Sequence, residues 1–451
     1  MNLTFRGGVH PKGRKELSRE APLRRFDPGP CEMVFPMAQH IGKPAKAIVK
    51  KNDPVLVGQK LAEADGFVSA CVISSCSGKV KAVEKRRTIA GTMTECVVVE
   101  NDGAYTPMEG IGVRQDLSGL TNQDILNRVK EAGIVGLGGA GFPTHVKLAP
   151  KDPAAIRWVI ANGAECEPYL TCNDQLMRTK AKEIIEGLEL VLRLFPKAEG
   201  VVGIEKNKPE AIAAMEAAAA GKERIRVLRL HTKYPQGGEH TLIKVIVGAD
   251  YPVSKLPADV GCIVDNVGTL YAIQRAVCYG EPLFTHGLTV SGKAVVKPRN
   301  FIVPDGTNVR ELIEACGGVK EGAVLKKVLA GGPMMGFALS DLDVPVVKTT
   351  NGLTMILRDG VEVAERQRTA CLRCGRCTTV CPTGLLPELM AEAARREDYD
   401  RYENKLHGLE CVACGSCSFI CPAKRPLTET FKQVKAEILA RKRAAQAGGK
   451  K

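Results

Sequence analysis

Two cysteine-rich segments constrain the fold of this chain more than any other feature. In each, three cysteines spaced by two residues are followed, after three more residues, by a fourth cysteine and a proline; the eight are Cys371, Cys374, Cys377, Cys381, Cys411, Cys414, Cys417 and Cys421. A zinc site commonly takes two spaced pairs of ligands, whereas three closely spaced cysteines with a distant fourth suit a cubane iron–sulfur cluster. The duplicated pattern predicts two 4Fe-4S clusters, with two zinc sites as the alternative.

The ligands of each cluster follow from the behaviour of two-cluster ferredoxins, in which the fourth cysteine of each motif ligates the other cluster. By that rule Cys421 joins the first three cysteines, and Cys381 joins the three that begin at Cys411. The segment between the motifs is rich in helix formers and longer than a minimal ferredoxin hairpin needs. We therefore predict a helical two-cluster ferredoxin domain over residues 361–435, followed by a basic tail over residues 436–451.

The charge of the chain is concentrated at its two ends. The formal net charge is +14 over 451 residues, of which the first 60 residues carry +7 and the last 20 carry +6. Because the middle is nearly neutral, we interpret the excess as solvated ends; contact with an anionic membrane surface is the second interpretation, and nucleic acid is not expected. No apolar run approaches the roughly 18 residues of a spanning helix, and no export signal is visible, so a cytoplasmic location is expected.

The length and the local patterns predict a multidomain chain of α/β and α+β class. Short β-rich runs with Asp-Pro, Asp-Gly and Ser-Gly turns indicate a small all-β sandwich. It resembles the biotinyl/lipoyl type of barrel-sandwich domain, so an N-terminal β barrel-sandwich hybrid domain is assigned, with its arm, to residues 1–115. Alternating helical and β-rich runs predict an α/β domain with a largely parallel sheet over residues 116–282. Two strands, a helix and a third strand then predict a β-grasp domain, which with its linker covers residues 283–360.

The predicted α/β domain carries four polar, glycine-bearing loops. The first, Gly136-Leu-Gly-Gly-Ala-Gly141, matches a dinucleotide fingerprint in spacing, but a helix precedes it where a strand is required, so it is a weak Rossmann signal. Its bare backbone still allows close approach to a ring or a phosphate, with Lys147 nearby to meet negative charge. The other loops begin at Asn162, Tyr234 and Asp265, and four such loops in one domain favour a cofactor site.

The segments GLGGAGFPTHVK, ANGAECEPYLT, YPQGGE and DNVGTLYA resemble the FMN and NADH loops of the flavoprotein subunit of respiratory complex I. Over its full length, with TFRGGVHP, QHIGKPA, GGPMMG and the two cysteine motifs, the chain resembles the RnfC family, the C subunits of the Rnf complex, which is an ion-translocating ferredoxin:NAD oxidoreductase. The resemblance also implies that the β-grasp domain is of the soluble-ligand-binding type.

The resemblance implies residues for two nucleotide ligands. For FMN these are Gly136, Gly138, Gly139, Gly141, Lys147, Asn162, Glu165, Tyr234, Gly237, Asp265, Asn266 and Thr269. NAD(H), as substrate, is expected near Phe142, Glu167 and Glu239, with Gly238 in the same loop. The sequence departs from the complex I pattern at Ala164, Tyr169 and Gly238, where an acid, a glycine and a glutamate are usual.

A chain that binds NAD(H), FMN and two 4Fe-4S clusters converts two-electron into one-electron chemistry, and needs no acid, base or nucleophile, so no catalytic residue is assigned. The resemblance implies a peripheral subunit on the cytoplasmic face of the cell membrane. Its expected partners are other Rnf subunits, including membrane-embedded ones and a ferredoxin-like subunit, with ferredoxin contacted indirectly. The alternatives are a cobalamin reductase-like flavoprotein, in which the flavin domain precedes the sandwich domain, and a non-enzymatic assembly adaptor with structural clusters.

Overall fold

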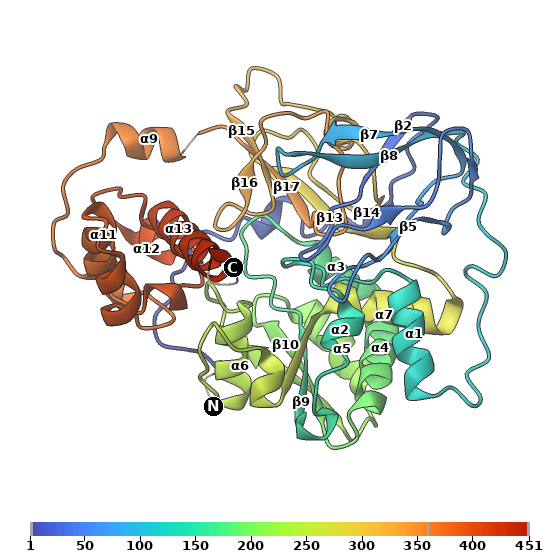
Figure 1. The fold of residues 1–451 in the computed structure, drawn as a ribbon, viewed down its shortest axis with the longest axis horizontal. Coiled ribbons are helices and arrows are strands. Elements are labelled where there is room, and N and C mark those ends of the chain that lie inside the picture. The colour runs from blue at the N-terminus through green and yellow to red at the C-terminus, as the bar shows by residue number, and fades with distance from the viewer. Residues whose placement is uncertain (1–2, 359, 449–451) are drawn as a thin grey trace.

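The computed structural model describes residues 3–358 and 360–448. Four units are visible in Figure 1, with the helical C-terminal unit at one side of the molecule, next to the green α/β unit. The two β-rich units lie together above the α/β unit in this view. Within these described residues, no helix is both long and apolar enough to cross a membrane.

The N-terminal β unit is built from two small antiparallel sheets. One has the order β2-β8-β7-β4, with bounds Glu32–Pro36, Met93–Asn101, Gly78–Arg87 and Pro54–Val55. The other has the order β3-β5-β6, with bounds Lys46–Ala47, Lys60–Glu63 and Val72–Ile73. Apolar side chains from both sheets share one core, which includes Phe35, Leu61 and Val97. This is the predicted sandwich of two sheets around an apolar centre.

The α/β unit contains one four-stranded sheet in which every pairing is parallel, as the sequence predicts. The order is β11-β10-β9-β12, with bounds Ile225–Leu230, Glu199–Glu205, Trp158–Asn162 and Cys262–Asn266. The helices of this unit are α1 Asn122–Glu131, α2 Thr144–Lys147, α3 Cys172–Thr179, α4 Ala181–Leu194, α5 Pro209–Ala219, α6 Glu239–Val247 and α7 Val267–Tyr279.

Helix α1 shows how closely local sequence controls this region. The Thr121 hydroxyl accepts from the Asp124 backbone amide, while the Asp124 carboxylate accepts from the Thr121 amide, which is a complete capping box. Gly133, with a φ of 62°, follows the helix in the left-handed region that suits glycine. The helix expected before the glycine loop is therefore confirmed, and it ends immediately before that loop.

The β-grasp unit forms a six-stranded sheet with the order β1-β14-β13-β17-β15-β16. The bounds are Leu23–Arg25, Arg299–Pro304, Thr285–Gly292, Gly352–Ile356, Lys327–Ala330 and Phe337–Ala338, and helix α8 covers Val309–Ala315. The two predicted strands, the helix and the third strand are present. Strands β16 and β17 were not predicted, and β1 comes from the N-terminal arm, which the predicted domains group with the sandwich.

The C-terminal unit is helical and carries both cysteine motifs. Its helices are α9 Gly360–Arg366, α10 Arg376–Thr379, α11 Pro387–Arg395, α12 Ser416–Ile420 and α13 Leu427–Gly448, with a π-helical turn at Arg401–Lys405. A small core that includes Met390, Tyr402 and Phe431 holds α11 and α13 together. Helix α13 runs through most of the segment predicted as a basic tail; residues 449–451 of that segment lie outside the described residues. Short 3-10 turns elsewhere cover Lys15–Leu17, Pro153–Ala155, Pro257–Val260 and Gly408–Glu410.

Candidate functional site

The parallel sheet has a topological switch point between β9 and β12. The chain passes from β9 to β10 and on to β11 at one edge, and then returns to place β12 on the opposite side of β9. Ligands of open α/β sheets bind at such a point, outside the carboxyl ends of the strands. Asn162 and Asn266 are register partners and are the last residues of these two strands. Two of the four predicted loops therefore start side by side at the expected place.

The glycine loop is tied to the start of α7 at the same edge. The Leu137 amide donates to the Thr269 hydroxyl at 2.9 Å, and the Asn266 side chain accepts from the Gly268 amide at 2.8 Å. Gly138 has a φ of 77°, and a Cβ there would lie 3.0 Å from the Asn266 amide nitrogen. A Cβ at Gly139 would meet nothing within 4 Å. The loop thus presents bare backbone toward open space beside two polar strand ends.

Lys147 supplies the positive charge of this edge. Its ammonium donates to the Asp265 carboxylate at 2.7 Å and to the Val264 carbonyl at 2.8 Å. The second carboxylate oxygen of Asp265 is buried and has no partner. Burial raises the pKa of the nearby Glu239, which Lys147 opposes, so the neutral carboxylic acid is favoured there more than at an exposed glutamate.

The loop that begins at Tyr234 closes over the end of β9. The Asn162 side chain donates to the Gly237 carbonyl at 2.9 Å. Gln236 in the same loop is fully buried, yet neither its amide nitrogen nor its amide oxygen has a partner. Buried polar groups are normally paired, so the unpaired atoms of Gln236 and Asp265 fit a ligand that offers both donors and acceptors, as FMN does.

Glu165 and Glu167 are bound within the protein. Glu165 accepts from the Asn173 amide at 2.8 Å, and its other oxygen lies 3.7 Å from the Lys15 ammonium. The Glu167 carboxylate accepts from the amides of Met334 and Met335, at 3.1 and 2.7 Å, in the Gly-Gly-Pro-Met-Met-Gly segment of the β-grasp unit. Their predicted contacts with FMN and NAD(H) stay predictions.

Phe142 and Gly141 lie between the α/β unit and its two β-rich neighbours. The Phe142 carbonyl accepts from the Gly136 amide at 2.9 Å, which closes the glycine loop on itself. A Cβ at Gly141 would lie 2.8 Å from the Thr349 methyl and 3.2 Å from the Cα of His40. His40 belongs to the segment QHIGKPA, so the sandwich and β-grasp units both approach this loop.

Tyr234 connects the nucleotide-binding edge with the helical unit. Its side chain is 1% exposed, and its hydroxyl donates to the carbonyl of Cys414 at 2.7 Å. Val9 in the N-terminal arm forms an antiparallel bridge with Tyr234, and the adjacent Gly8 amide donates to the Val380 carbonyl at 2.8 Å. The arm, the tyrosine loop and residues beside cysteines of both motifs thus meet at one junction, which sequence reasoning did not locate. The motif TFRGGVHP contains Gly8 and Val9, and the motif YPQGGE begins with Tyr234.

The eight cysteines line two cavities, and the division follows the cross-ligation rule. One cavity is lined by Cys381 together with Cys411, Cys414 and Cys417. The other is lined by Cys421 together with Cys371, Cys374 and Cys377. In the described part of the chain, no group of His, Cys, Asp and Glu side chains is arranged to hold a single metal ion. A four-iron cluster is larger than one ion and lies among its ligands, so four thiols around one cavity fit it.

The two cysteine sets differ in position and exposure. We call the set of Cys381, Cys411, Cys414 and Cys417 the inner set, because Tyr234 contacts it and Cys414 is buried. We call the set of Cys371, Cys374, Cys377 and Cys421 the outer set, because Cys371 and Cys374 are exposed.

The site combines polar loops at the switch point of a parallel sheet with a helical unit that carries two four-cysteine sets. This combination defines the class of protein: an iron–sulfur flavoprotein that transfers electrons. Four family models match the chain in the predicted order: an RnfC barrel-sandwich hybrid domain at 3–104, a Nuo51 FMN-binding domain at 129–275, an SLBB domain at 288–338 and a 4Fe-4S dicluster domain at 364–438.

Curated relatives resemble the whole chain. The C subunit of the proton-translocating ferredoxin:NAD(+) oxidoreductase complex of Clostridium ljungdahlii is 41% identical, over 97% of this chain and 94% of the relative. The C subunit of the Na(+)-translocating ferredoxin:NAD(+) oxidoreductase complex of Acetobacterium woodii is 42% identical, over 98% of each chain. A longer relative from Pseudomonas aeruginosa, the C subunit of an ion-translocating oxidoreductase complex, is 40% identical over 88% of this chain and 51% of its own length.

The chain therefore belongs to the RnfC family, the C subunits of Rnf-type ferredoxin:NAD(+) oxidoreductase complexes, as the sequence predicts. It is an oxidoreductase subunit with an FMN-binding domain and a domain for two 4Fe-4S clusters, and its fold class is confirmed by the domain matches. The sandwich domain precedes the flavin domain, the reverse of the order expected for the cobalamin reductase alternative.

Proposed function

We propose that this chain accepts or delivers a hydride equivalent at the switch point between β9 and β12, and passes single electrons through the inner set to the outer set. The observation that carries the proposal is the Tyr234 hydrogen bond to Cys414, because it joins a nucleotide-loop residue directly to a cluster-binding segment. The order of the two sets follows from this contact and from the exposure of Cys371 and Cys374. When bound, FMN supplies exchange of a hydride with nicotinamide and of single electrons with the clusters.

The residues that hold FMN in this proposal are those of the glycine loop, Lys147, the two strand ends and Thr269. The bare loop backbone allows close approach, and the Lys147 ammonium attracts the phosphate. Asp265 and Gln236 offer unpaired polar atoms to the ligand. Glu239 lies near Lys147 at the same edge and is proposed for the nicotinamide side, together with Phe142 and Glu167. A Cβ at Gly237 would lie 3.5 Å from the Asn162 side-chain oxygen, and a Cβ at Gly238 would lie 2.7 Å from the Thr241 hydroxyl.

The proposal places the chain as a peripheral subunit on the cytoplasmic face of the membrane, within a multi-subunit complex. Support comes from the two relatives matched over nearly their full length, whose names describe C subunits of ion-translocating complexes. Membrane-embedded subunits and a ferredoxin-like subunit are the proposed partners. An anionic membrane surface is a further proposed contact of the basic ends.

The test is anaerobic reconstitution with iron, sulfide and FMN, followed by addition of NADH. We expect bleaching of the flavin absorption and reduction of two 4Fe-4S clusters, measured by electron paramagnetic resonance. Lys147→Met should weaken FMN binding about tenfold or more, because it removes the cation of this edge and leaves the buried Asp265 carboxylate unpaired beside the ligand. Lys151→Met is the matched control, since Lys151 is exposed and follows α2 closely in sequence. Iron-loaded protein that binds no FMN would favour the adaptor alternative and overturn the proposal.

A further inference from the structure

A small cavity lies where the N-terminal arm joins the β-grasp sheet. Strand β1 of the arm pairs in parallel with β14, with Leu23 opposite Asn300, so the two strands begin side by side. The cavity at their start has a volume of about 220 Å³ and is lined by residues that lead into both strands. Because β1 is an outermost strand of the sheet, this cavity lies at a sheet edge, apart from the nucleotide loops and the cysteine sets.

The charged residues of this cavity all have the same sign. Arg24, Lys297 and Arg299 line it, and no acidic side chain does so in the described part of the chain. Side chains alternate between the two faces of a strand, and the register places Arg24 and Arg299 on the same face, opposite to Leu23 and Asn300. Three cations from two distant segments of the chain therefore share one small space.

These cations are not neutralised within the protein. Among residues 3–358 and 360–448, none of the three forms an ion pair, and the Nε of Arg299 is shielded from solvent without a hydrogen-bond partner. Nearby arginines behave differently: Arg25 pairs with Asp27, and Arg310 donates two hydrogen bonds of 2.7 Å to Asp343. Because buried donors are normally paired, the Nε of Arg299 indicates a place for an acceptor from outside the chain.

The walls of the cavity are held in place by the fold. The Asn300 side chain donates to the carbonyls of Ser18 and Ala21, each at 2.9 Å, and its oxygen accepts from two buried threonine hydroxyls. Pro22 and Pro298 stand directly before the two strands and restrict the backbone on either side. An incoming anion therefore meets cations on a fixed frame, which lowers the ordering cost of binding.

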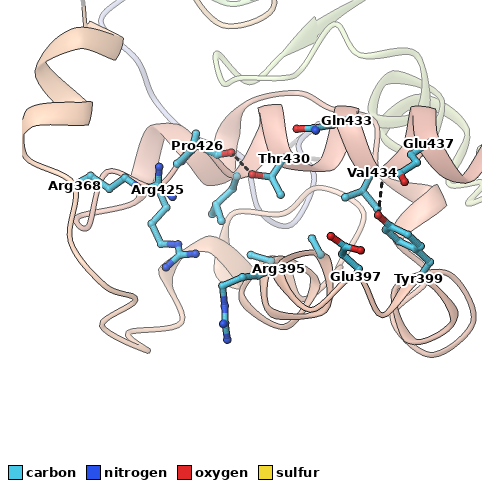
Figure 2. Close-up of a pocket in the computed structure, with 13 residues that line it drawn as sticks. Arg368, Arg395, Glu397, Tyr399, Arg425, Pro426, Thr430, Gln433, Val434 and Glu437 are labelled. Atoms are coloured by element: carbon cyan, nitrogen blue, oxygen red, sulfur yellow. Dashed lines mark hydrogen bonds between the residues drawn. The ribbon is translucent and has the colours of Figure 1, made fainter.

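A cavity in the helical unit shows what distinguishes this one. Figure 2 shows Arg368, Arg395 and Arg425 around that cavity, together with Glu397 and Glu437. Because acidic side chains share it with the arginines, an anion would meet both signs of charge there. At the start of β1 and β14, every charged residue that lines the cavity is cationic. The comparison favours the cavity of the arm as the anion site.

The size and chemistry of the cavity define a class of ligand. Cofactor pockets commonly measure roughly 300–1,000 Å³, so a volume of about 220 Å³ suits one anionic group better than a whole nucleotide. Guanidinium groups hold phosphate through paired hydrogen bonds, and a phosphomonoester at neutral pH carries a charge of about −1.5 to −2. Three cations match that charge better than they match the single charge of a carboxylate.

We propose that Arg24, Lys297 and Arg299 bind a phosphomonoester, and that the bound group ties strand β1 of the arm to the β-grasp sheet. Binding uses charge and hydrogen bonds, and no covalent bond changes. A free phosphate compound and the headgroup of phosphatidic acid in a membrane offer the same chemistry, and the experiment separates these two sources. The inference goes beyond the proposed function, since it involves neither the nucleotide edge nor the clusters.

The experiment uses the full chain loaded with FMN and clusters, so that the nucleotide edge is not available to the probe. Inorganic phosphate is titrated by calorimetry at constant ionic strength, and saturable binding is expected. At a phosphate concentration of about ten times Kd, amide hydrogen exchange in β1 should slow about tenfold, because opening of the strand must release the ligand.

Variants assign the binding to the three cations. Arg24→Gln combined with Arg299→Gln should weaken phosphate binding about tenfold or more and abolish the protection of β1. Arg25→Gln is the matched control, because Arg25 lies in the same strand but pairs with Asp27, and it should bind phosphate like the parent. Iron and FMN contents are measured for every variant, so that a folding defect is distinguished from loss of the anion site.

The source of the phosphate is tested with phosphatidylcholine vesicles that contain phosphatidic acid. Vesicle binding that is weakened in the double variant and kept in Arg25→Gln would assign the site to the lipid headgroup. Phosphate binding that depends on the two arginines, with equal vesicle binding by parent and double variant, would assign it to a soluble phosphate compound. Either result supports the proposal.

Three results would overturn the proposal. The first is phosphate and vesicle binding that the double variant keeps in full, or the absence of both in the parent. The second is phosphate binding that Arg25→Gln weakens as much as the double variant does. The third is phosphate binding that is lost in Arg395→Gln and kept in the double variant, which would place the anion in the cavity of Figure 2.

Discussion

The α/β unit is joined to its neighbours through two different kinds of junction. Toward the β-rich units, the fully buried Lys348 donates from its ammonium to the carbonyls of Cys71 and Gly133, each at 2.7 Å, and so connects three units at one point. A second buried network, formed by the side chains of Ser18, Thr171, Thr289 and Asn300, joins the N-terminal arm and the α/β unit to the β-grasp sheet. These polar side chains are buried, so each must lose its contact with water to form the junction.

Toward the helical unit, the junction consists mainly of backbone groups. The Gly8 amide bonds to the Val380 carbonyl, Val9 pairs with Tyr234, and the Tyr234 hydroxyl bonds to Cys414. Val380 and Cys414 lie in the cysteine motifs, so the position of these groups depends on how the inner set is held. We therefore expect the first junction to be an intrinsic property of the polypeptide, and the second to depend on the cluster proposed for the inner set.

The largest expected effect comes from removing one cluster at a time. Cys381→Ala should abolish the inner cluster and Cys421→Ala the outer one, each halving the iron content, because the motifs exchange their fourth ligands. A Cβ at Gly7 would lie 2.7 Å from the Cys381 carbonyl, so the arm packs against the inner set. Limited proteolysis of the arm should therefore accelerate in Cys381→Ala alone. Equal proteolysis in both variants would remove the distinction between the junctions.

The second prediction concerns the pH dependence of the first junction. Burial lowers the pKa of Lys348 from 10.5 to about 8. Between these values the unfolded chain keeps a proton that the folded protein releases, so the free energy of unfolding rises with pH there, by up to about 3 kcal/mol. Lys348→Met should lose this rise, whereas the exposed Lys79→Met should keep it.

The measurement is urea unfolding followed by the fluorescence of Trp158, the single tryptophan, which lies in β9 and reports on the α/β unit. The free energy of unfolding is measured for the parent and for Lys348→Met at pH values below about 8 and above 10.5, which are the pKa values of Lys348 in the folded and unfolded chain. The difference between the two proteins is then compared between these two pH ranges. A difference that does not change with pH would show that Lys348 keeps an ordinary pKa and that burial does not disfavour its charged form.

The folds of the four domains could be predicted from the sequence, because hydrophobic periodicity and helix capping are set by residues close together in the chain. The capping box at Thr121 and the alternation around β9 and β10 decide those elements without help from elsewhere. It missed β17 because a central strand in a mixed sheet lacks clear alternation, and it missed β1 because three residues carry no periodic signal. The four loops and the cysteine sets could be anticipated from composition and spacing, whereas the roles of Lys348 and Tyr234 depend on long-range packing.

The third prediction tests the arm itself. Gly8 has a φ of 78°, and a Cβ there would lie 2.6 Å from the Tyr234 carbonyl oxygen. Gly8→Ala should destabilise the arm by about 1–3 kcal/mol, because a side chain is strained in that conformation. Amide hydrogen exchange at Val9 and Tyr234 should accelerate about tenfold or more. Gly13→Ala is the matched control, since its Cβ would meet only Lys15 Cγ at 3.6 Å. Slow exchange in Gly8→Ala would mean that the arm does not hold the second junction.

The smallest expected effect separates one hydrogen bond from the rest of the second junction. Tyr234→Phe keeps the ring but leaves the buried Cys414 carbonyl without its donor, at a cost of about 1–3 kcal/mol. Tyr402→Phe is matched to it, because Tyr402 is fully buried in the helical unit and its hydroxyl has no partner among the described residues, so its loss should cost nothing. Removal of iron by a chelator should accelerate for the inner cluster in Tyr234→Phe and stay at the parent rate for the outer cluster. If both clusters lost iron faster, or if Tyr402→Phe had the same effect, the tyrosine would support the module as a whole, and the coupling between the nucleotide loops and the inner set would have to reside in the arm.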